Sequence, residues 1–491
     1  MEFPALSPKQ RQALDRIQQE FAITPDNVQS IIRGIHRSME QGLAKPGQTL
    51  AMLPSFIVNG ANGTEKGVCL ALDLGGTNFR VCQITLKGVP GEYSMVQKKY
   101  LIPQTLKTAP ATELFGFIAD GIHDFLRENV ENGSGEHTSG SSTNGEAVRK
   151  ISLGFTFSFP VLQKALNHGE LTQWNKGFTC SGAVGHNVPD LLQRALQARN
   201  INVQVTALLN DTVGALAACS YGHSGTLLGV ILGTGSNVAY MEKISRIPKF
   251  LQEHPHLVNT PAVEQDMGIN MEWGSFDNEG KVVPSNQYDQ LLDDSSPNQK
   301  NQMFEKRISG LYLGELFRLV ILDLVRHQLL FSGKVSTALE TPYLLDSSLV
   351  SAMVDDPTPK AQGLHPKVRA ELITQLGLDV DIASDADFSL ARGVACAIAT
   401  RSARLAGTGL SAVLLRRQDR LAVATPDDPI TIGIDGSLYE HFTTFREVMI
   451  QTLTSVIGEE NFAKLRIVLA KDGSGVGAAV AATMNNELPT L

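Results

Sequence analysis

The sequence predicts an α/β protein of two related lobes, and two observations support this prediction. An apolar run at 68–74 stops at two glycines and resumes as a second strand pattern. A third strand pattern and an amphipathic helix pattern then follow, as in an α/β lobe. Later, LLGVILGTGSNVAY (227–240) resembles LALDLGGTNFRV (70–81), because in both a strand pattern leads into Gly, a hydroxyl residue and Asn. Two lobes with one such turn each would explain the repetition, although short glycine-rich strings also match by chance.

The other elements follow in chain order. Ser7-Pro8 and Thr24-Pro25 each join an N-cap residue to a proline of the first helical turn, so a helix is predicted to begin at each and to pack on a body formed later in the chain. The predicted helices cover 8–21, 25–43, 111–128, 212–219, 304–331, most of 381–404 and the small-residue segment after 473. The predicted strands cover 68–74, 79–86, 96–102, a run from Ile151, 203–209, 238–241, 432–437 and 466–470. The polar segment at 131–146, rich in Gly, Ser and Thr, is predicted to be a flexible surface insertion.

Length and composition limit the class of protein. The 491 residues suffice for about three domains or two large lobes. A net charge of −8 argues against a general nucleic-acid binder, which would be basic. No apolar run reaches about 18 residues and the N-terminal segment lacks an apolar core, so neither membrane insertion nor a signal peptide is predicted. We expect a cytoplasmic protein that is a monomer or a weak homodimer.

The cysteines are typical of reduced, buried thiols. There are five of them, an odd number, without CxxC or metal-type spacing. If Gly75-Gly76 is a two-residue turn, Cys69 and Cys82 lie directly opposite each other, and we expect both to be free thiols.

The first glycine turn has the composition of a phosphate-binding hairpin. Gly75 and Gly76 can adopt the positive φ values of a tight turn and let backbone N–H groups approach an anion. Thr77, Asn78 and Arg80 supply hydroxyl, amide and guanidinium donors. An ordinary Gly-Gly hairpin with polar residues at its tip remains the alternative. Neither glycine-rich segment is a P-loop or a GxGxxG dinucleotide motif.

Asp211 stands where a ligand-binding carboxylate is expected. The predicted strand at 203–209 leads into Asn210-Asp211, and ligands of open α/β sheets bind at the carboxyl ends of strands. The alternative is that Asp211 is the N-cap of the helix beginning at Thr212.

Eight segments, in order, resemble the hexokinase family. They are LDLGGTNFR, LGFTFSFP, NKGF, LNDTVG, LGTGSN, MEWGSF, IGIDGS and DGSGVGAA. The resemblance runs from about Asn27 to Ala482 and is greatest to the single-unit glucokinases and hexokinases of fungi. It implies the actin-like ATPase (ribonuclease H-like) fold, with a small lobe at 67–208 and 472–491 and a large lobe at 1–66 and 209–471. It also implies transfer of the γ-phosphoryl group of ATP to the 6-hydroxyl of glucose or another hexose, the first step of glycolysis.

The resemblance also implies roles for single residues. Asp211 would accept the proton of the sugar 6-hydroxyl, Lys176 would reach the sugar and the charge developing on the transferred group, and Arg80 would be the third catalytic residue. The implied sugar contacts are Ser158, Asn175, Lys176, Asn210, Asp211, Asn237, Glu272 and Glu305. Taken alone, Glu305 would be a solvated helix acid and Glu272 an ion-pair partner. The family usually has Thr where this chain has Asn175, so sugar selectivity stays open.

The implied nucleotide contacts come from four glycine-containing segments. They are Asp73, Gly75, Gly76, Thr77, Asn78, Arg80, Gly233, Thr234, Gly235, Asp435, Gly436, Ser437, Gly473, Ser474 and Gly475. Because Asp73 would repel phosphate, it is expected to orient water on Mg²⁺, which is held through the phosphates of ATP and water rather than by a protein metal site. The alternative for 435–437 is a simple turn, and for 473–475 a helix start.

Three other functions stay open at this point. Asn175 keeps open a kinase for N-acetylglucosamine or another amino sugar on the same fold. A non-catalytic sugar sensor should lack the base or break a glycine turn, yet Asp211, Lys176 and both turns are intact. An actin-like chaperone ATPase would have no reason to keep the set of sugar contacts.

Overall fold

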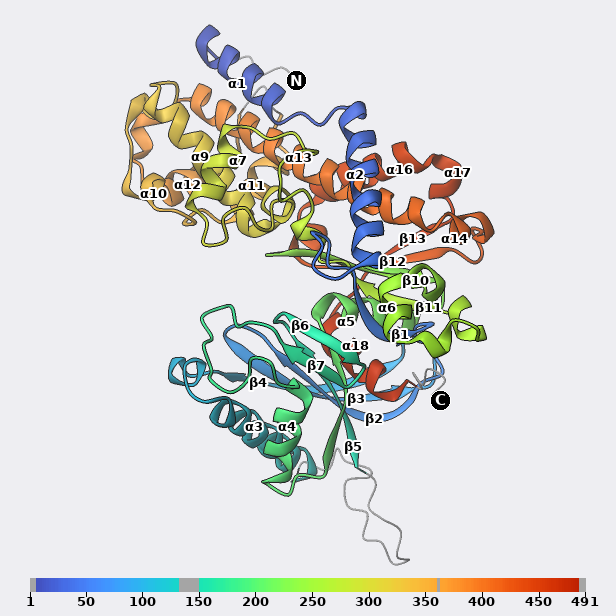
Figure 1. The fold of residues 1–491 in the computed structure, drawn as a ribbon. Coiled ribbons are helices and arrows are strands. Elements are labelled where there is room, and N and C mark those ends of the chain that lie inside the picture. Colours follow the sequence, from blue (N-terminus) through green and yellow to red (C-terminus); the bar gives the residue numbers. More distant parts are fainter. Residues whose placement is uncertain (1–5, 132–149, 360–362, 485–491) are drawn as a thin grey trace, which may run out of the picture.

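The computed structural model describes residues 6–131, 150–359 and 363–484. Figure 1 shows two β-sheets with helices α5 (Asp211–Gly222) and α18 (Gly473–Thr483) between them, and a layer of helices beyond one of the sheets. Apart from its first residue, the predicted insertion at 131–146 lies outside the described residues. Among the helices in these ranges, none has both the length and the apolar character needed to span a membrane.

The smaller sheet has five strands in the order β4-β3-β2-β5-β8. They are β2 (Lys66–Leu74), β3 (Asn78–Lys87), β4 (Tyr93–Leu101), β5 (Ile151–Phe157) and β8 (Val203–Leu209). β2, β3 and β4 are antiparallel, and β5 and β8 continue the sheet as parallel strands. Side chains alternate along a strand, so Leu70 and Leu72 of β2 pack toward α3 (Ala111–Glu131) and α4 (Val188–Gln197), whereas Cys69 and Ala71 belong to the core on the opposite face. Both faces of the sheet are therefore covered at β2, whereas the edge strand β4 stays partly exposed.

The larger sheet repeats this arrangement. Its order is β1-β11-β10-β9-β12-β13, with strands β1 (Leu53–Val58), β9 (Thr226–Leu232), β10 (Ser236–Lys243), β11 (Asp266–Asn270), β12 (Ile430–Asp435) and β13 (Leu465–Leu469). β9, β10 and β11 are antiparallel, and β12 and β13 extend the sheet in parallel from β9. The hairpins β2–β3 and β9–β10 thus occupy equivalent places, which confirms the predicted repetition. β1 is an additional edge strand beside β11.

The two central helices exchange sheets. α5 follows β8 of the smaller sheet but packs on β9, β10 and β12, whereas α18 follows β13 of the larger sheet but packs on β2, β5 and β8. The two helices touch through glycines, since a Cβ atom on Gly477 would lie 1.9 Å from the carbonyl oxygen of Gly214. A Cβ atom on Gly154 of β5 would likewise lie 1.9 Å from the carbonyl oxygen of Ala478. Glycine is required at these positions because backbones approach each other without room for a side chain.

The helical layer surrounds the long helix α13. Its members are α1 (Pro8–Glu20), α2 (Pro25–Ala44), α7 (Gln287–Ser295), α8 (Glu305–Ile308), α9 (Gly310–Arg326), α10 (Thr337–Glu340), α11 (Ser347–Val354), α12 (Pro366–Leu376), α13 (Asp385–Arg416), α14 (Gln418–Val423), α16 (Thr443–Ile457) and α17 (Glu459–Phe462). The short elements β6 (Val161–Ala165), β7 (His168–Leu171), α6 (Pro248–Glu253) and α15 (Ser437–His441) lie at the margins of the sheets. α1 and α2 begin with capping boxes at Ser7 and Thr24 and pack on α13, as predicted.

The register of the first hairpin differs from the predicted one. The pairing of β2 with β3 leaves four residues, 75–78, between the last paired positions, so the turn is not a two-residue turn. Cys69 therefore lies opposite Ile84, and Cys82 does not face it. All five cysteines are free and buried, as predicted.

The role of the two turn glycines is also corrected. Neither Gly75 nor Gly76 has a positive φ, because the longer turn closes with a 3.0 Å hydrogen bond from the N–H of Gly75 to the carbonyl of Asn78. Gly76 is needed for another reason: a Cβ atom there would lie 3.2 Å from Cβ of Lys176. The missing side chain lets this turn approach the lysine.

Two predicted helices have different limits. The helix expected at 304–331 is broken at Ser309, whose extended backbone (φ −91°, ψ 155°) separates α8 from α9. The helix expected at 381–404 begins at Asp385 and continues to Arg416 as α13. The break at Ser309 places the predicted sugar contact Glu305 in the short helix α8, apart from α9.

Candidate active site

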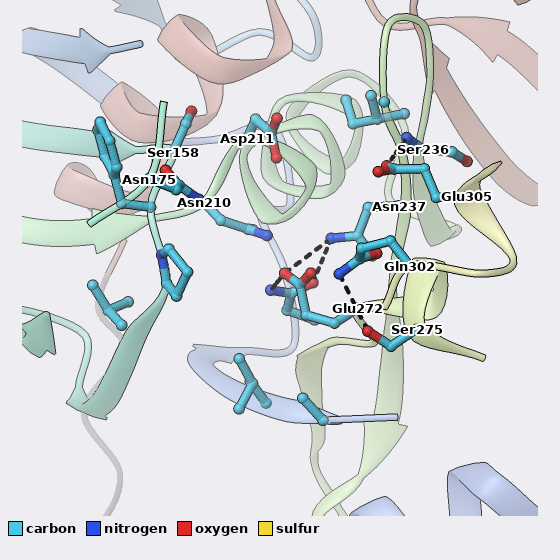
Figure 2. A pocket seen from close by; sticks show the side chains of 18 of the residues that line it. Ser158, Asn175, Asn210, Asp211, Ser236, Asn237, Glu272, Ser275, Gln302 and Glu305 are labelled. Carbon is cyan, nitrogen blue, oxygen red and sulfur yellow. Dashed lines mark hydrogen bonds between the residues drawn. The ribbon is translucent and has the colours of Figure 1, made fainter. Parts of the chain in front are cut away.

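A cavity of about 1000 Å³ lies between the two sheets and brings together residues that are far apart in the sequence. The predicted site residues in its wall are Ser158, Asn175, Lys176, Asn210, Asp211, Thr234, Gly235, Asn237, Glu272 and Glu305. Figure 2 shows Ser158 and Asn175 on one side and Glu272 and Glu305 on the other, with Asp211 between them at the start of a helix. All the predicted sugar contacts therefore share one cavity.

The side of the cavity next to the smaller sheet is formed where β5 ends. Ser158 directly follows β5 rather than lying within a strand, and its carbonyl accepts a 2.7 Å hydrogen bond from Nζ of Lys176. The same ammonium lies 5.3 Å from the centroid of the Phe159 ring. Lys176 has a φ of 54°, in the left-handed region that side chains seldom adopt outside functional sites and turns. Loss of hydration lowers the pKa of Lys176, whereas Asp211 and other carboxylates of the site oppose this shift.

Asn210 and Asp211 stand at the start of α5, and their side chains make different hydrogen bonds. Asn210 is the N-cap, since its Oδ1 accepts a 2.8 Å hydrogen bond from the N–H of Val213. The alternative that Asp211 is the cap is therefore wrong. Oδ1 of Asp211 accepts from the N–H and from Oγ1 of Thr212 at 2.7 Å and 3.0 Å. These bonds fix the carboxylate and leave Oδ2 for a ligand, while Nδ2 of Asn210 can still donate.

Two asparagines of the larger sheet hold the Glu272 carboxylate. Its Oε1 accepts from Nδ2 of Asn270 at 2.7 Å and from Nδ2 of Asn237 at 3.3 Å; Figure 2 shows Asn237 beside Glu272. Glu272 itself is held in a left-handed conformation, with a φ of 55°. Burial raises the pKa of Glu272, and the two amide donors lower it. Asn237 thus supports Glu272 as well as lining the cavity.

Glu305 enters the cavity from the start of α8. Its Oε2 accepts a 2.8 Å hydrogen bond from the N–H of Ser236, which ties it to the second glycine turn. A Cβ atom on Gly235 would lie 3.0 Å from the same oxygen, so a side chain there would crowd the Glu305 carboxylate. Burial raises the pKa of Glu305 to about 7, and the charges of Glu272 and Asp211 act in the same direction. Glu305 therefore changes its charge near neutral pH.

The predicted nucleotide residues of the smaller sheet form a network beside the cavity. The Arg80 guanidinium donates to Asp472 at 2.9 Å, to Ser474 at 3.2 Å and to Asp73 at 3.3 Å. Oγ of Ser474 also donates to Asp73 at 3.0 Å. This network joins the β2–β3 hairpin, which carries Thr77 in its turn, to the start of α18. Arg80 is thus bound to two carboxylates, and its direct contact with phosphate stays a prediction.

The predicted nucleotide residues of the larger sheet, 233–235 and 435–437, lie at the carboxyl ends of β9 and β12, which are parallel neighbours. Gly436 has a φ of 121°, and a Cβ atom there would lie 2.2 Å from the carbonyl oxygen of Leu232, so this turn requires glycine. Burial raises the pKa of both Asp73 and Asp435, and the charge of Asp211 adds to each shift. The charge of Asp211 therefore acts on a carboxylate of each sheet.

Comparison with known proteins identifies the family. One hexokinase family model matches residues 13–221, and a second matches residues 227–484. The glucokinase of Aspergillus niger is 40% identical over 494 residues, which cover 97% of this chain and 97% of the relative. The chain belongs to the hexokinase family. A hexokinase of Emericella nidulans is 35% identical, with 94% of this chain and 89% of the relative covered.

The fold is also that of hexokinases. One similar solved structure is a hexokinase from Schistosoma mansoni complexed with glucose. It is 34% identical to this chain, with a TM-score of 0.79, and the match covers 96% of this chain and 99% of the S. mansoni chain. A second crystal structure, titled as a hexokinase, is 28% identical and gives the same TM-score. The predicted family and the predicted actin-like ATPase fold are confirmed.

Three side chains of this hexokinase site were missed by the sequence analysis. Asn270, Ser275 and Gln302 line the cavity, and Nε2 of Gln302 donates to Oγ of Ser275 at 3.2 Å. Asn270 stands two residues before Glu272, and Gln302 three residues before Glu305, so closeness to a predicted contact was the available signal. Gln302, like Lys176 and Glu272, has a positive φ, which no sequence pattern indicated.

Proposed function

We propose that this chain transfers the γ-phosphoryl group of ATP to the 6-hydroxyl of glucose and related hexoses, giving hexose 6-phosphate and ADP, the first step of glycolysis. One observation carries the proposal: the Asp211 carboxylate shares a single cavity with the Lys176 ammonium and a pair of carboxylates, Glu272 and Glu305. A sugar presents several adjacent hydroxyls that both donate and accept, and carboxylates and amides bind such groups in pairs. The S. mansoni relative was solved with glucose.

In this proposal Asp211 accepts the proton of the 6-hydroxyl as the sugar oxygen attacks the γ-phosphorus. The new bond joins the sugar oxygen to phosphorus, the bond between phosphorus and the β,γ-bridging oxygen breaks, and ADP leaves with that electron pair. Phosphoryl transfer depends mainly on positioning and charge stabilisation, so a carboxylate held by the Thr212 N–H suits the role. Lys176, the cation at this end of the cavity, would offset the negative charge of the transferred group.

ATP would lie along the two glycine turns, with Mg²⁺ carried on its phosphates to neutralise their charge. Within residues 6–131, 150–359 and 363–484, no group of three or more His, Cys, Asp or Glu side chains is arranged to hold a metal ion. Because its carboxylate would repel the phosphates, Asp73 is proposed to act on Mg²⁺ through water. Both hydrogen bonds to its carboxylate end on Oδ2, which leaves Oδ1 to orient a metal-bound water.

The lobes are proposed as 67–208 with 472–491 and 1–66 with 209–471. The packing of α18 on the smaller sheet and of α5 and β1 with the larger one supports this division. Closure of the lobes on the sugar would exclude water, which is itself a hydroxyl acceptor for phosphoryl transfer. Five free thiols suit a reducing compartment, and we propose a cytoplasmic monomer or weak homodimer.

Sugar binding is expected to weaken as the pH falls below about 7. Burial raises the pKa of Glu305 to about 7, so below this pH the side chain is increasingly protonated and loses acceptor capacity for a sugar hydroxyl. The ionised form binds sugar better, so binding lowers this pKa and releases a proton. The KM for glucose should rise by up to about tenfold per pH unit on the acidic side. The KM for glucose is measured between about pH 6 and about pH 8. In Glu305→Gln, which has no titratable group at this position, the KM should no longer depend on pH. The same increase of KM at low pH in this variant would contradict the role of Glu305.

The proposed reaction is tested by coupled detection of ADP release from the purified protein with glucose, fructose, mannose and N-acetylglucosamine. Glucose is expected to be turned over with the highest kcat/KM. Failure to turn over any hexose would refute the proposal.

An amino-sugar kinase is the second candidate, and Asn175 is the observation that favours it. Asn175 lies in the cavity wall, where its amide could donate to an acyl oxygen on the sugar. A higher kcat/KM for N-acetylglucosamine than for glucose, reversed by Asn175→Thr, would establish this candidate in place of the first.

A further inference from the structure

A buried ionic cluster lies against the segment that carries Glu305. Its members are Asp277, Asp289, Asp293, Lys306, Arg307 and Arg401, and none of their side chains is more than 3% exposed. Three negative and three positive charges balance within it. Lys306 and Arg307 directly follow Glu305 in α8, so one short helical turn presents Glu305 to the cavity and the next two side chains to the cluster.

Lys306 and Asp293 fix the loop before Glu305. Nζ of Lys306 lies 2.6 Å from Oδ1 of Asp293 and donates to the carbonyl of Asn298 at 2.8 Å. Asp293 also accepts from the N–H of Lys300 at 2.9 Å. The loop from 298 to 306, which carries Gln302, is therefore held at both ends by one ion pair.

The rest of the cluster holds Arg307 by charge. Arg401 and Asp289 form two parallel 2.8 Å hydrogen bonds, and the Arg401 guanidinium stacks over the Phe21 ring. Nη1 of Arg307 lies 4.0 Å from Oδ2 of Asp277, and its three side-chain nitrogens have no hydrogen-bond partner among the described residues. A buried guanidinium without hydrogen bonds is stabilised by the charges of the carboxylates around it. Arg307 is therefore held beside Asp277 and the other acids of the cluster.

The other side of the segment is fixed to the second glycine turn. Besides the bond from Ser236 to Glu305, the N–H of Gly310 donates to the carbonyl of Gly233 at 2.8 Å, and the N–H of Leu311 donates to that of Thr234 at 3.1 Å. A four-residue helix has little stability of its own, so these contacts must set its position.

We infer that the buried ionic cluster sets the position of the Glu305 carboxylate, and that Lys306 and Asp293 are positioning residues for sugar binding. The inference rests on the proposed function, because Glu305 matters only where a sugar binds. Neither residue lines the cavity, so any effect on the sugar must pass through the residues of this segment that do, Asn298, Gln302 and Glu305.

The test compares Lys306→Met and Asp293→Asn with a control that breaks a similar buried ion pair elsewhere. Arg318 and Glu315 of α9, with side chains 4% and 0% exposed, form such a pair outside the cluster, so Arg318→Met is the control. In both cluster variants the KM for glucose should rise by about tenfold or more while the KM for ATP changes by less than about twofold. Arg318→Met should lower Tm without raising the KM for glucose.

Glucose binding can also be measured without turnover. The two tryptophans of the chain, Trp174 and Trp273, directly precede Asn175 and follow Glu272, so their fluorescence should report the sugar. A wild-type KM for glucose in Asp293→Asn, which keeps the size of the side chain, would overturn the inference, and so would an equal rise in Arg318→Met. Absence of hexose-dependent ADP release from the wild type would refute the proposed function instead, and the fluorescence titration would still test the cluster.

Discussion

Asp211→Asn is expected to lower kcat for hexose phosphorylation by about 10²–10⁴-fold, the usual contribution of a general base. The asparagine can keep an oxygen for the Thr212 N–H, which Asp211 now binds at 2.7 Å, so the start of α5 should stay folded. It cannot accept the proton of the 6-hydroxyl. The KM for glucose should change much less than kcat, since most sugar contacts remain. Steady-state measurement of ADP release gives kcat and KM, and the Tm of the variant shows whether it stays folded.

Thr212→Val is the matched control for this prediction. It removes the 3.0 Å hydroxyl bond to Oδ1 of Asp211 but leaves the carboxylate and the backbone bond in place. A decrease in kcat of less than about tenfold is expected. Near-normal turnover by Asp211→Asn would show that another group accepts the proton.

Gly477→Ala is expected to destabilise the whole protein. Its methyl group would lie 1.9 Å from the carbonyl oxygen of Gly214, so α5 and α18 would have to move apart. Overpacking usually costs about 1–3 kcal/mol, and this case should reach or exceed the upper end because a backbone atom has no other rotamer. A lower Tm and a lower yield of folded protein are the measurable results.

Gly475→Ala provides the control on the same helix. The nearest atom to its added methyl group would be Sγ of Cys82 at 3.7 Å, an ordinary contact. Because alanine favours helix by up to about 1 kcal/mol over glycine, Tm should stay the same or rise slightly. Equal Tm values for the two variants would contradict the close packing described for α5 and α18.

Elements with strong local signals could be predicted well. The pairs Ser7-Pro8 and Thr24-Pro25 and the apolar run of β8 predicted helix starts and a strand that agree closely with the structure. The register of β2 and β3 was predicted wrongly, because two adjacent glycines suggest a two-residue turn although the pairing leaves four residues between the strands. Edge strand β1 was not predicted, since it pairs with β11 only in the folded sheet.

The site could be predicted residue by residue only through the family resemblance. Composition and spacing indicated a glycine turn and a carboxylate at a strand end, but not that Glu305, in the short helix before the break at Ser309, would accept a hydrogen bond from the N–H of Ser236. The position of Arg80 between two carboxylates also depends on α18, which lies far along the chain. These contacts are tertiary, and local sequence carries little information about them.

The exchange of helices between sheets has a consequence for the newly made chain. Cys69 of β2 lies against Ala479 of α18, 410 positions later, so one face of the smaller sheet has no cover until the last segment is made. At roughly 5–20 residues per second, the ribosome needs on the order of 20–80 s to reach it. During this time an apolar surface is open to aggregation, which makes the nascent chain a natural client of chaperones. Refolding from denaturant should be slow for the same reason, because contacts this distant in sequence must form before the second face of the smaller sheet is covered.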